Sequence, residues 1–208
     1  MAVMHIPGHD HQRPREVTLE EVRAVLGDCR LCPLGETRTN LVFGVGNPHA
    51  RVMFIGEAPG RNEDLQGEPF VGAAGHNLDS LLSLAGLRRE DIYIANVLKC
   101  RPPQNRDPLP EEEDACIDYL RAQVKLIDPK VIVCLGRIAA GYIIDPNFKM
   151  MKQHGQWFEK DGRLMMGMLH PAAVLRNPNQ RPVAFADFVT LRNKAEEICT
   201  RTQLVYPE

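Results

Sequence analysis

Apolar positions along the chain fall into two alternating patterns. Short, mostly apolar runs at 51–55, 92–98, 131–135 and 164–169 are typical of strands buried in a sheet. Between these runs, apolar residues recur three or four positions apart, which predicts helices over residues 17–26, 73–85, 110–126, 137–143 and 185–198. Thr18, followed three residues later by Glu21, provides a capping box for the first helix.

The alternation of strands and helices predicts an α/β fold, a three-layer α/β/α sandwich whose central, mostly parallel sheet has four strands. No linker or repeat divides the chain, so we expect one domain over residues 17–208, preceded by a flexible leader over residues 1–16. Ligands bind beyond the carboxyl ends of the strands in such sheets. The residues that follow each predicted strand are therefore the first candidates for function.

Composition narrows the class of protein. With 44% hydrophobic and 25% charged residues, the chain has the composition of a globular domain, and no run reaches the ~20 apolar residues that span a bilayer. The amino-terminal residues lack the pattern of a secretion signal, and six cysteines in such a chain argue against a disulfide framework. We expect a cytoplasmic protein that makes no contact with a membrane.

Charge is distributed unevenly. The net charge of −2 gives no general attraction to nucleic acid, whose phosphates favour basic proteins. Basic residues nevertheless gather at two places, one at Lys99, Arg101 and Arg106 and the other at Arg176 and Arg181. Such local groups can bind an anion, or they can be ordinary solvated faces of the protein.

Four cysteines have a spacing that suits a metal centre. Cys29 and Cys32 form C-x2-C, and after a gap of 67 residues Cys100 and Cys116 form C-x15-C. Thiolates suit iron–sulfur clusters and zinc, and the spacing does not separate the two. A C-x-x-C pair can also be a redox pair or arise by chance. Of the remaining cysteines, Cys134 is expected to be a buried core thiol and Cys199 to be inert.

Unusual motifs follow the predicted strands. G-E-A-P-G at 56–60 and G-E-P-F-V-G at 67–72 come after the first strand, Asn96 and K-C-R-P at 99–102 after the second, and H-P-A-A-V-L-R-N-P at 170–178 after the last. Taken singly, each has an ordinary structural explanation as a turn, a core aromatic residue or a strand-capping histidine. Together with the four cysteines, in this order, they resemble the family 4 uracil-DNA glycosylases, the iron–sulfur branch of the uracil-DNA glycosylase superfamily.

The resemblance implies that the protein removes uracil from DNA by breaking the bond between the base and deoxyribose. The target base must first be flipped out of the stack into a pocket. In that pocket, the resemblance assigns Phe70 as the platform on which uracil stacks and Asn96 as the amide that reads its edge and rejects cytosine. Backbone of the first motif would line the same pocket, at Gly56, Ala58 and Gly60.

The same resemblance assigns two catalytic residues. His170 would donate to uracil O2 and stabilise the negative charge that develops there in the transition state. Glu57 would position or activate water, and its carboxylate would favour a cationic sugar. The best-known branch of the superfamily places its water-activating aspartate one position after the residue that corresponds to Glu57. The present chain has Ala58 there, as family 4 does.

Contacts to the rest of the DNA are implied by the same motifs. Leu175, with Val174 or Arg176 beside it, corresponds to the wedge that fills the gap left by the flipped nucleotide. Phosphate contacts are expected from basic residues close to the motifs, Lys99, Arg101 and Arg176.

For the cysteines, the resemblance implies a [4Fe–4S] cluster in which Cys29, Cys32, Cys100 and Cys116 each bind one iron. Some iron–sulfur relatives crosslink to uracil-containing DNA through a histidine in an inserted basic loop. The segment 97–115 contains no histidine, which argues against crosslinking.

The leading hypothesis is a monofunctional uracil-DNA glycosylase of base-excision repair. It would act as a monomer on single- or double-stranded DNA, with downstream repair proteins as further partners. Two alternatives stay open: a protein that binds or covalently traps uracil-containing DNA without turnover, and an iron–sulfur docking module for a polymerase or another repair protein. The presence of both Glu57 and His170 favours turnover.

Overall fold

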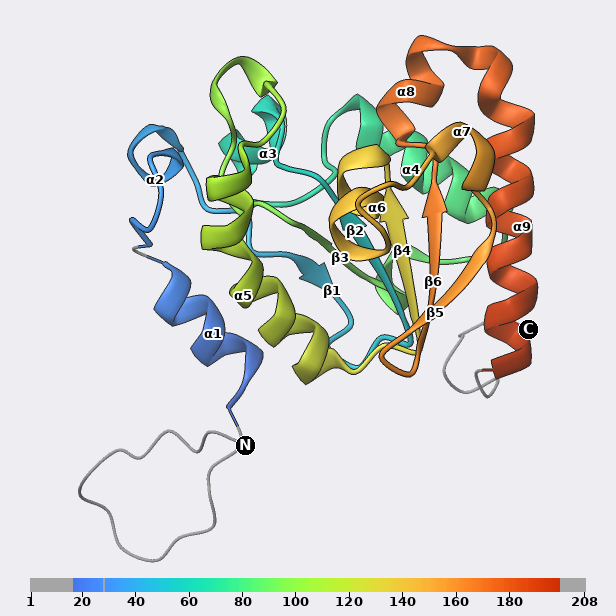
Figure 1. Cartoon of the computed structure of the whole chain (residues 1–208), viewed down its shortest axis with the longest axis horizontal. Coiled ribbons are helices and arrows are strands. Elements are labelled where there is room, and N and C mark those ends of the chain that lie inside the picture. The colour runs from blue at the N-terminus through green and yellow to red at the C-terminus, as the bar shows by residue number, and fades with distance from the viewer. Residues whose placement is uncertain (1–16, 28, 199–208) are drawn as a thin grey trace, which may run out of the picture.

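A mostly parallel sheet forms the middle layer of the protein. The computed structural model describes residues 17–27 and 29–198, and within them the sheet has six strands in the order β1-β3-β2-β4-β6-β5 (Figure 1). The inner strands are parallel to one another, whereas β1 and β5 pair antiparallel at the two edges. The strands run over Val45–Gly46 (β1), Val52–Gly56 (β2), Tyr93–Asn96 (β3), Val131–Leu135 (β4), Trp157–Lys160 (β5) and Arg163–Met168 (β6).

The predicted α/β fold with a mostly parallel sheet is confirmed, but the predicted count of four strands is wrong because two edge strands are added. β1 has only two residues, too few for a recognisable apolar run. β5 is a half-exposed segment with a polar end. It joins β6 through Asp161 and Gly162, whose φ angles of 53° and 72° build a tight two-residue hairpin turn.

The five predicted helices are all present as α1, α4, α5, α6 and α9, with ends that differ by up to four residues from the prediction. The backbone N–H of Glu21 donates to Oγ1 of Thr18 over 3.2 Å, so the capping box is confirmed. In the described ranges, no helix is long and apolar enough to cross a membrane. The five predicted helices, and four further short ones within the described residues, run over Leu19–Leu26 (α1), Leu34–Thr37 (α2), Arg61–Gln66 (α3), Ala73–Leu84 (α4), Pro110–Ile127 (α5), Arg137–Ile143 (α6), Met150–Gln153 (α7), Pro171–Arg176 (α8) and Arg181–Ile198 (α9).

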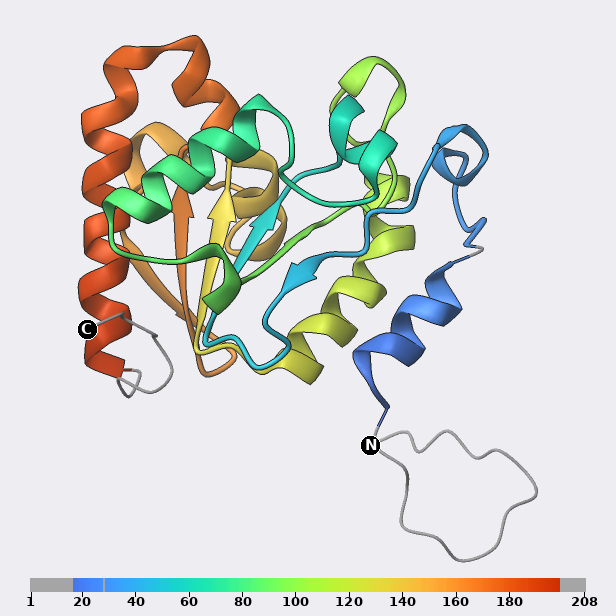
Figure 2. The same ribbon diagram turned by 180° about the vertical axis from the view of Figure 1, so that it is seen from behind.

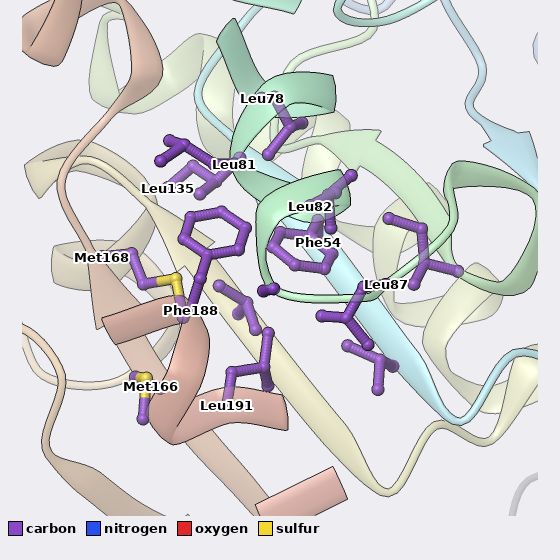
Figure 3. Packing of buried hydrophobic residues seen from close by; sticks show 14 of the residues in the cluster. Phe54, Leu78, Leu81, Leu82, Leu87, Leu135, Met166, Met168, Phe188 and Leu191 are labelled. Carbon is purple, nitrogen blue, oxygen red and sulfur yellow. The ribbon is translucent and has the colours of Figure 1, made fainter. Parts of the chain in front are cut away.

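Different helices cover the two faces of the sheet, as the three-layer prediction requires. Side chains alternate along β2, so Phe54 points to one face, where it packs with Leu82 of α4 and Phe188 of α9 (Figure 3). The rings of Phe54 and Phe188 are stacked with centroids 6.0 Å apart. Met53 and Ile55 point to the other face, against α5 and α6. Figure 2 shows α4 lying across the first of these faces.

The parallel pairing has one consequence for function. It brings the carboxyl ends of β2, β3, β4 and β6 to a single edge of the sheet. The helices α7 and α8 lie at that edge, toward which the arrowheads of β4 and β6 point (Figure 1). The leader predicted over residues 1–16, and Cys199, lie outside the described residues.

Candidate active site

A cavity of about 640 Å³ opens at the carboxyl edge of the inner strands. Its walls come from the ends of four strands, since Glu57 follows β2, Asn96 ends β3, Gly136 follows β4 and His170 follows β6. Other residues that the motifs predicted also line it, namely Ala58, Gly60, Phe70 and Arg176. The cavity therefore unites groups that are far apart in the sequence.

Asn96 presents an unpaired hydrogen-bond acceptor at this cavity. Its side chain is buried, with 2% of the residue exposed, and its Oδ1 has no hydrogen-bond partner among the described residues. Leaving a buried polar atom unpaired costs about 1–3 kcal/mol, so the site favours a ligand with a matching donor. Gly56 lies against this atom, because a Cβ at Gly56 would collide with Oδ1 and come within 2.8 Å of the Phe70 ring.

Phe70 is held in an uncommon backbone conformation, with a φ of 54°. The carboxylate of Glu63 accepts hydrogen bonds from the next two backbone N–H groups, of Val71 at 3.0 Å and Gly72 at 2.9 Å. Gly75 in α4 allows the helix to approach closely, since a Cβ there would overlap the carbonyl oxygen of Phe70. The aromatic ring is therefore fixed at the cavity by its own backbone surroundings.

His170 is a neutral donor in the structure. Burial lowers the pKa of His170 to about 4, with a smaller effect in the same direction from Arg176 and an opposing one from Glu63. The backbone N–H of Ala172 donates to Nδ1 of His170 over 3.1 Å. A neutral imidazole that accepts at Nδ1 carries its proton on Nε2, and the ring centroid lies 5.7 Å from that of Phe70.

Glu57 is suited to exchange a proton near neutral pH. Burial is the main cause that raises the pKa of Glu57 to about 7, and the charges of Asp107 and Glu113 raise it further, while Arg137 lowers it. Asp107 and Arg137 both line the cavity and form an ion pair with each other. A carboxyl group with a pKa near 7 can serve as a base at physiological pH.

The four predicted metal ligands lie in one region beside the cavity. Cys32, Cys100 and Cys116 pack in the same small cluster as Ala58 of the cavity wall, and Cys29 packs against a neighbouring cluster that several α5 residues also contact. Nitrogen donors approach two of the sulfur atoms: Nη1 of Arg38 lies 3.4 Å from Sγ of Cys100, and the backbone N–H of Lys99 lies 3.3 Å from Sγ of Cys116.

The thiols influence one another electrostatically. Burial raises the pKa of Cys116 to about 11 and also raises that of Cys100. Cys32 adds to the rise at both of these thiols, and Cys29 adds to the rise at Cys100. In the part of the chain that the structure describes, no three His, Cys, Asp or Glu side chains are arranged to hold a single metal ion.

Comparison with known proteins decides the family. The sequence profile of the "Uracil DNA glycosylase superfamily" matches residues 43–192. The chain is 48% identical to the type-4 uracil-DNA glycosylase of Archaeoglobus fulgidus over 89% of its own length and 96% of that protein. It is 44% identical to the type-4 uracil-DNA glycosylase of Sulfurisphaera tokodaii, over 86% of this chain and 85% of the relative. The chain belongs to the uracil-DNA glycosylase superfamily.

For this superfamily member, two expected DNA contacts need correction. Lys99 is completely buried, with Nζ donating to the backbone oxygen of Asn96 at 2.9 Å and to Oε1 of Gln123 at 2.6 Å, so it is not available to a phosphate. Burial also lowers the pKa of Lys99 to about 7. Val174 is fully buried in the core, so it cannot serve as part of a wedge.

The other expected DNA contacts lie near the cavity. Leu175 is half-buried in the short helix α8, and Arg176, next to it, is exposed at the cavity. Arg101 is half-buried, and its Nε donates to Oδ1 of Asn105 over 2.7 Å. Asn105 also lines the cavity, so the side chain of Arg101 is held close to the site.

The structure adds site residues that the sequence did not reveal. Arg137 lies two residues after β4, at the start of α6, and could have been found by the same strand-end rule that located Glu57 and Asn96. Glu63 carries no such signal, since it lies inside the short helix α3 and acts through the backbone of the loop that bears Phe70. Asp107 comes from the loop between β3 and α5 and was likewise not foreseen.

Proposed function

We propose that the chain is a uracil-DNA glycosylase, which hydrolyses the bond between uracil and deoxyribose in DNA and leaves an abasic site for base-excision repair. The observation that carries this proposal is the unpaired Oδ1 of Asn96 beside the Phe70 ring. Uracil offers a donor at N3, whereas cytosine offers an acceptor there and would leave the amide oxygen unpaired. The type-4 uracil-DNA glycosylases among the relatives support the assignment.

The residues of the cavity divide the chemistry between them. A flipped uracil stacks on Phe70 and pairs its edge with Asn96. When the C1′–N1 bond breaks, its electrons leave with uracil, and the Nε2–H of His170 stabilises the negative charge that collects on O2. Water then adds to the cationic C1′ and passes its proton to the carboxylate of Glu57. The products are uracil and an abasic deoxyribose, with the strand intact.

We further propose that Cys29, Cys32, Cys100 and Cys116 hold a [4Fe–4S] cluster. The donor set fits, because four thiols lie in one region and nitrogen donors approach two of the sulfur atoms. When bound, the cluster would crosslink the segment after α1 to α5 beside the cavity wall. Absorbance together with iron and sulfide analysis of the purified protein tests this, with four of each per chain expected.

The proposed enzyme also contacts DNA beyond the flipped base. Arg101 and Arg176 contact phosphates, and Leu175 fills the gap that the flipped nucleotide leaves. Residues 17–208 act as one catalytic domain, and the protein works as a monomer in the cytoplasm. The substrate is uracil-containing DNA, either single- or double-stranded.

The decisive experiment uses the full chain and a labelled oligonucleotide that carries one deoxyuridine. Alkali cleaves abasic sites, so cleavage at that position over many turnovers is the expected result, with an oligonucleotide containing cytosine in its place as the control. A parallel denaturing gel without alkali tests for a covalent protein–DNA product. A retarded band there, or intact DNA after alkali, would overturn the proposal in favour of a trapping or docking protein.

A further inference from the structure

Lys99 occupies an unusual position for a lysine. None of its surface is exposed, and its ammonium group donates to two buried acceptors, the backbone oxygen of Asn96 and Oε1 of Gln123. Burying an ammonium ion is costly unless hydrogen-bond partners compensate for the lost water. A buried lysine therefore calls for an explanation beyond packing.

The two acceptors connect Lys99 to the cavity on one side and to helix α5 on the other. Asn96 carries the unpaired side-chain oxygen at the cavity, whereas Gln123 belongs to α5. Nε2 of Gln123 donates to the backbone oxygen of Phe43 at 2.9 Å and lies 3.3 Å from the hydroxyl of Tyr93. The amide of Gln123 is thus fixed on its far side and gives the ammonium group a rigid anchor.

The backbone around Asn96 is held from two directions. The N–H of Val97 donates to the carbonyl of Gly56 over 2.9 Å, and Lys99 binds the carbonyl of Asn96 itself. These two bonds restrain the peptide group that joins residues 96 and 97. The direction of the Asn96 side chain depends on that peptide group, because its Cα is attached to it.

We propose that Lys99, anchored by Gln123, is a positioning residue that holds Asn96 in the orientation needed to bind uracil. This inference rests on the function proposed above. Lys99 does not touch the substrate; it acts through the backbone of Asn96. Its loss would leave the Asn96 carbonyl unpaired and free to turn, and the amide would spend less time aligned with the uracil edge.

The test compares Lys99→Met with a matched control, Lys125→Met, on α5, where the side chain is exposed. The readouts are the single-turnover rate on deoxyuridine DNA, inhibition by free uracil, the melting temperature and iron per chain. We expect Lys99→Met to weaken inhibition by uracil and to slow excision, each by about tenfold to a hundredfold. Iron per chain and the folded fraction should stay at the wild-type level, and Lys125→Met should match wild type throughout.

Two results would overturn the inference. One is Lys99→Met with wild-type inhibition by uracil, and the other is a loss of activity that merely follows the loss of folded, iron-loaded protein. If Lys99→Met does not fold, Gln123→Met decides the question, since it keeps the lysine and removes its anchor. Uracil inhibition weakened several-fold in that variant supports the inference, and unchanged inhibition overturns it.

The wild-type protein separates this inference from the proposed function. If wild type forms no abasic sites, the function proposed above fails, whatever the variants do. If wild type excises uracil and Lys99→Met does so equally well, only the role of Lys99 is lost.

Discussion

The backbone N–H of Ala172 donates a hydrogen bond to Nδ1 of His170 over 3.1 Å. This bond begins helix α8 and at the same time selects the tautomer of the imidazole, which must carry its proton on Nε2. Because burial holds the pKa of His170 near 4, the ring stays neutral across the physiological range. A donor that is neutral and oriented before substrate arrives needs little reorganisation when charge develops on the leaving base.

Removing this donor should slow the chemical step. We expect His170→Ala to reduce the single-turnover rate on deoxyuridine DNA by about 10²–10³, with a smaller change in DNA affinity. His76→Ala, at an exposed position of α4, is the control and should keep the wild-type rate. A His170→Ala rate within a few-fold of wild type would remove the histidine from the mechanism.

Changing the amide at position 96 should relax the choice of base. In Asn96→Asp, acceptors replace the amide donor, so the exocyclic amine of cytosine can pair where uracil O4 cannot. We expect slower uracil excision and measurable cytosine excision, assayed on matched oligonucleotides that carry one uracil or one unpaired cytosine. Unchanged selectivity would mean that another group reads the edge of the base.

The pH dependence of excision should follow the ionisation of Glu57. If its carboxylate accepts the proton of water, the rate rises with pH up to about 7 and then levels off. Glu57→Gln should be slow and lack this rise. Asp107→Asn removes a negative charge that raises the pKa and should move the rise to lower pH, whereas Arg137→Met should move it to higher pH. Each shift should be less than about one pH unit.

Those two charge variants also discriminate between explanations. They alter charges that form an ion pair with each other at the cavity, so a mere loss of that pair would change both profiles in the same way. Opposite shifts can arise only through the charge on a third group. Shifts in the same direction would show that Glu57 does not set the profile.

A pair of glycines tests the packing of Phe70. Gly75→Ala introduces a methyl group that overlaps the carbonyl of Phe70 and should destabilise the protein by about 1–3 kcal/mol. Gly141→Ala is the matched control in α6, where a Cβ meets nothing within 4 Å and should stabilise the helix by up to about 1 kcal/mol. Urea unfolding of both variants measures the free energies. Equal stabilities would show that α4 can move away from Phe70 freely.

The cysteines make a prediction of their own. Cys116→Ala should lower iron per chain, because it removes a proposed cluster ligand, whereas Cys134→Ala should keep full iron content. Cys134 is completely buried in β4 and lies in the packed layer beneath α6. Iron and sulfide analysis of the two purified variants makes the comparison. Equal iron content in both would argue against Cys116 as a ligand.

Much of the candidate site followed from the sequence because parallel strands end at one edge. Glu57 and His170 follow buried runs and Asn96 ends one, so the fold class predicted that all three lie at the same edge of the sheet. The motif containing Phe70 was also located correctly at the cavity. What the sequence did not contain was the reason for the position of Phe70, since Glu63 and Gly75 act through backbone contacts that leave no pattern.

Lys99 shows why one predicted DNA contact was wrong. A lysine among arginines beside a loop is ordinarily a solvated cation, and nothing local distinguishes it from Arg101. Its burial depends on Gln123, which lies on a helix 24 residues later. The two edge strands were missed for other reasons. β1 is only two residues long, too short to leave a pattern. β5 could have been predicted, because Asp161 and Gly162 before β6 are a recognisable hairpin signal.

The order of the strands in the sheet also determines how the site forms during folding. β2 pairs with both β3 and β4, so the sheet joins segments that are distant in the chain and must close long loops before its contacts form. Asn96, Phe70 and His170 come from three separate segments of this sheet and its connections. Binding of uracil or DNA would therefore make opening of the whole sheet less favourable, which amide hydrogen exchange would record as protection far from the cavity.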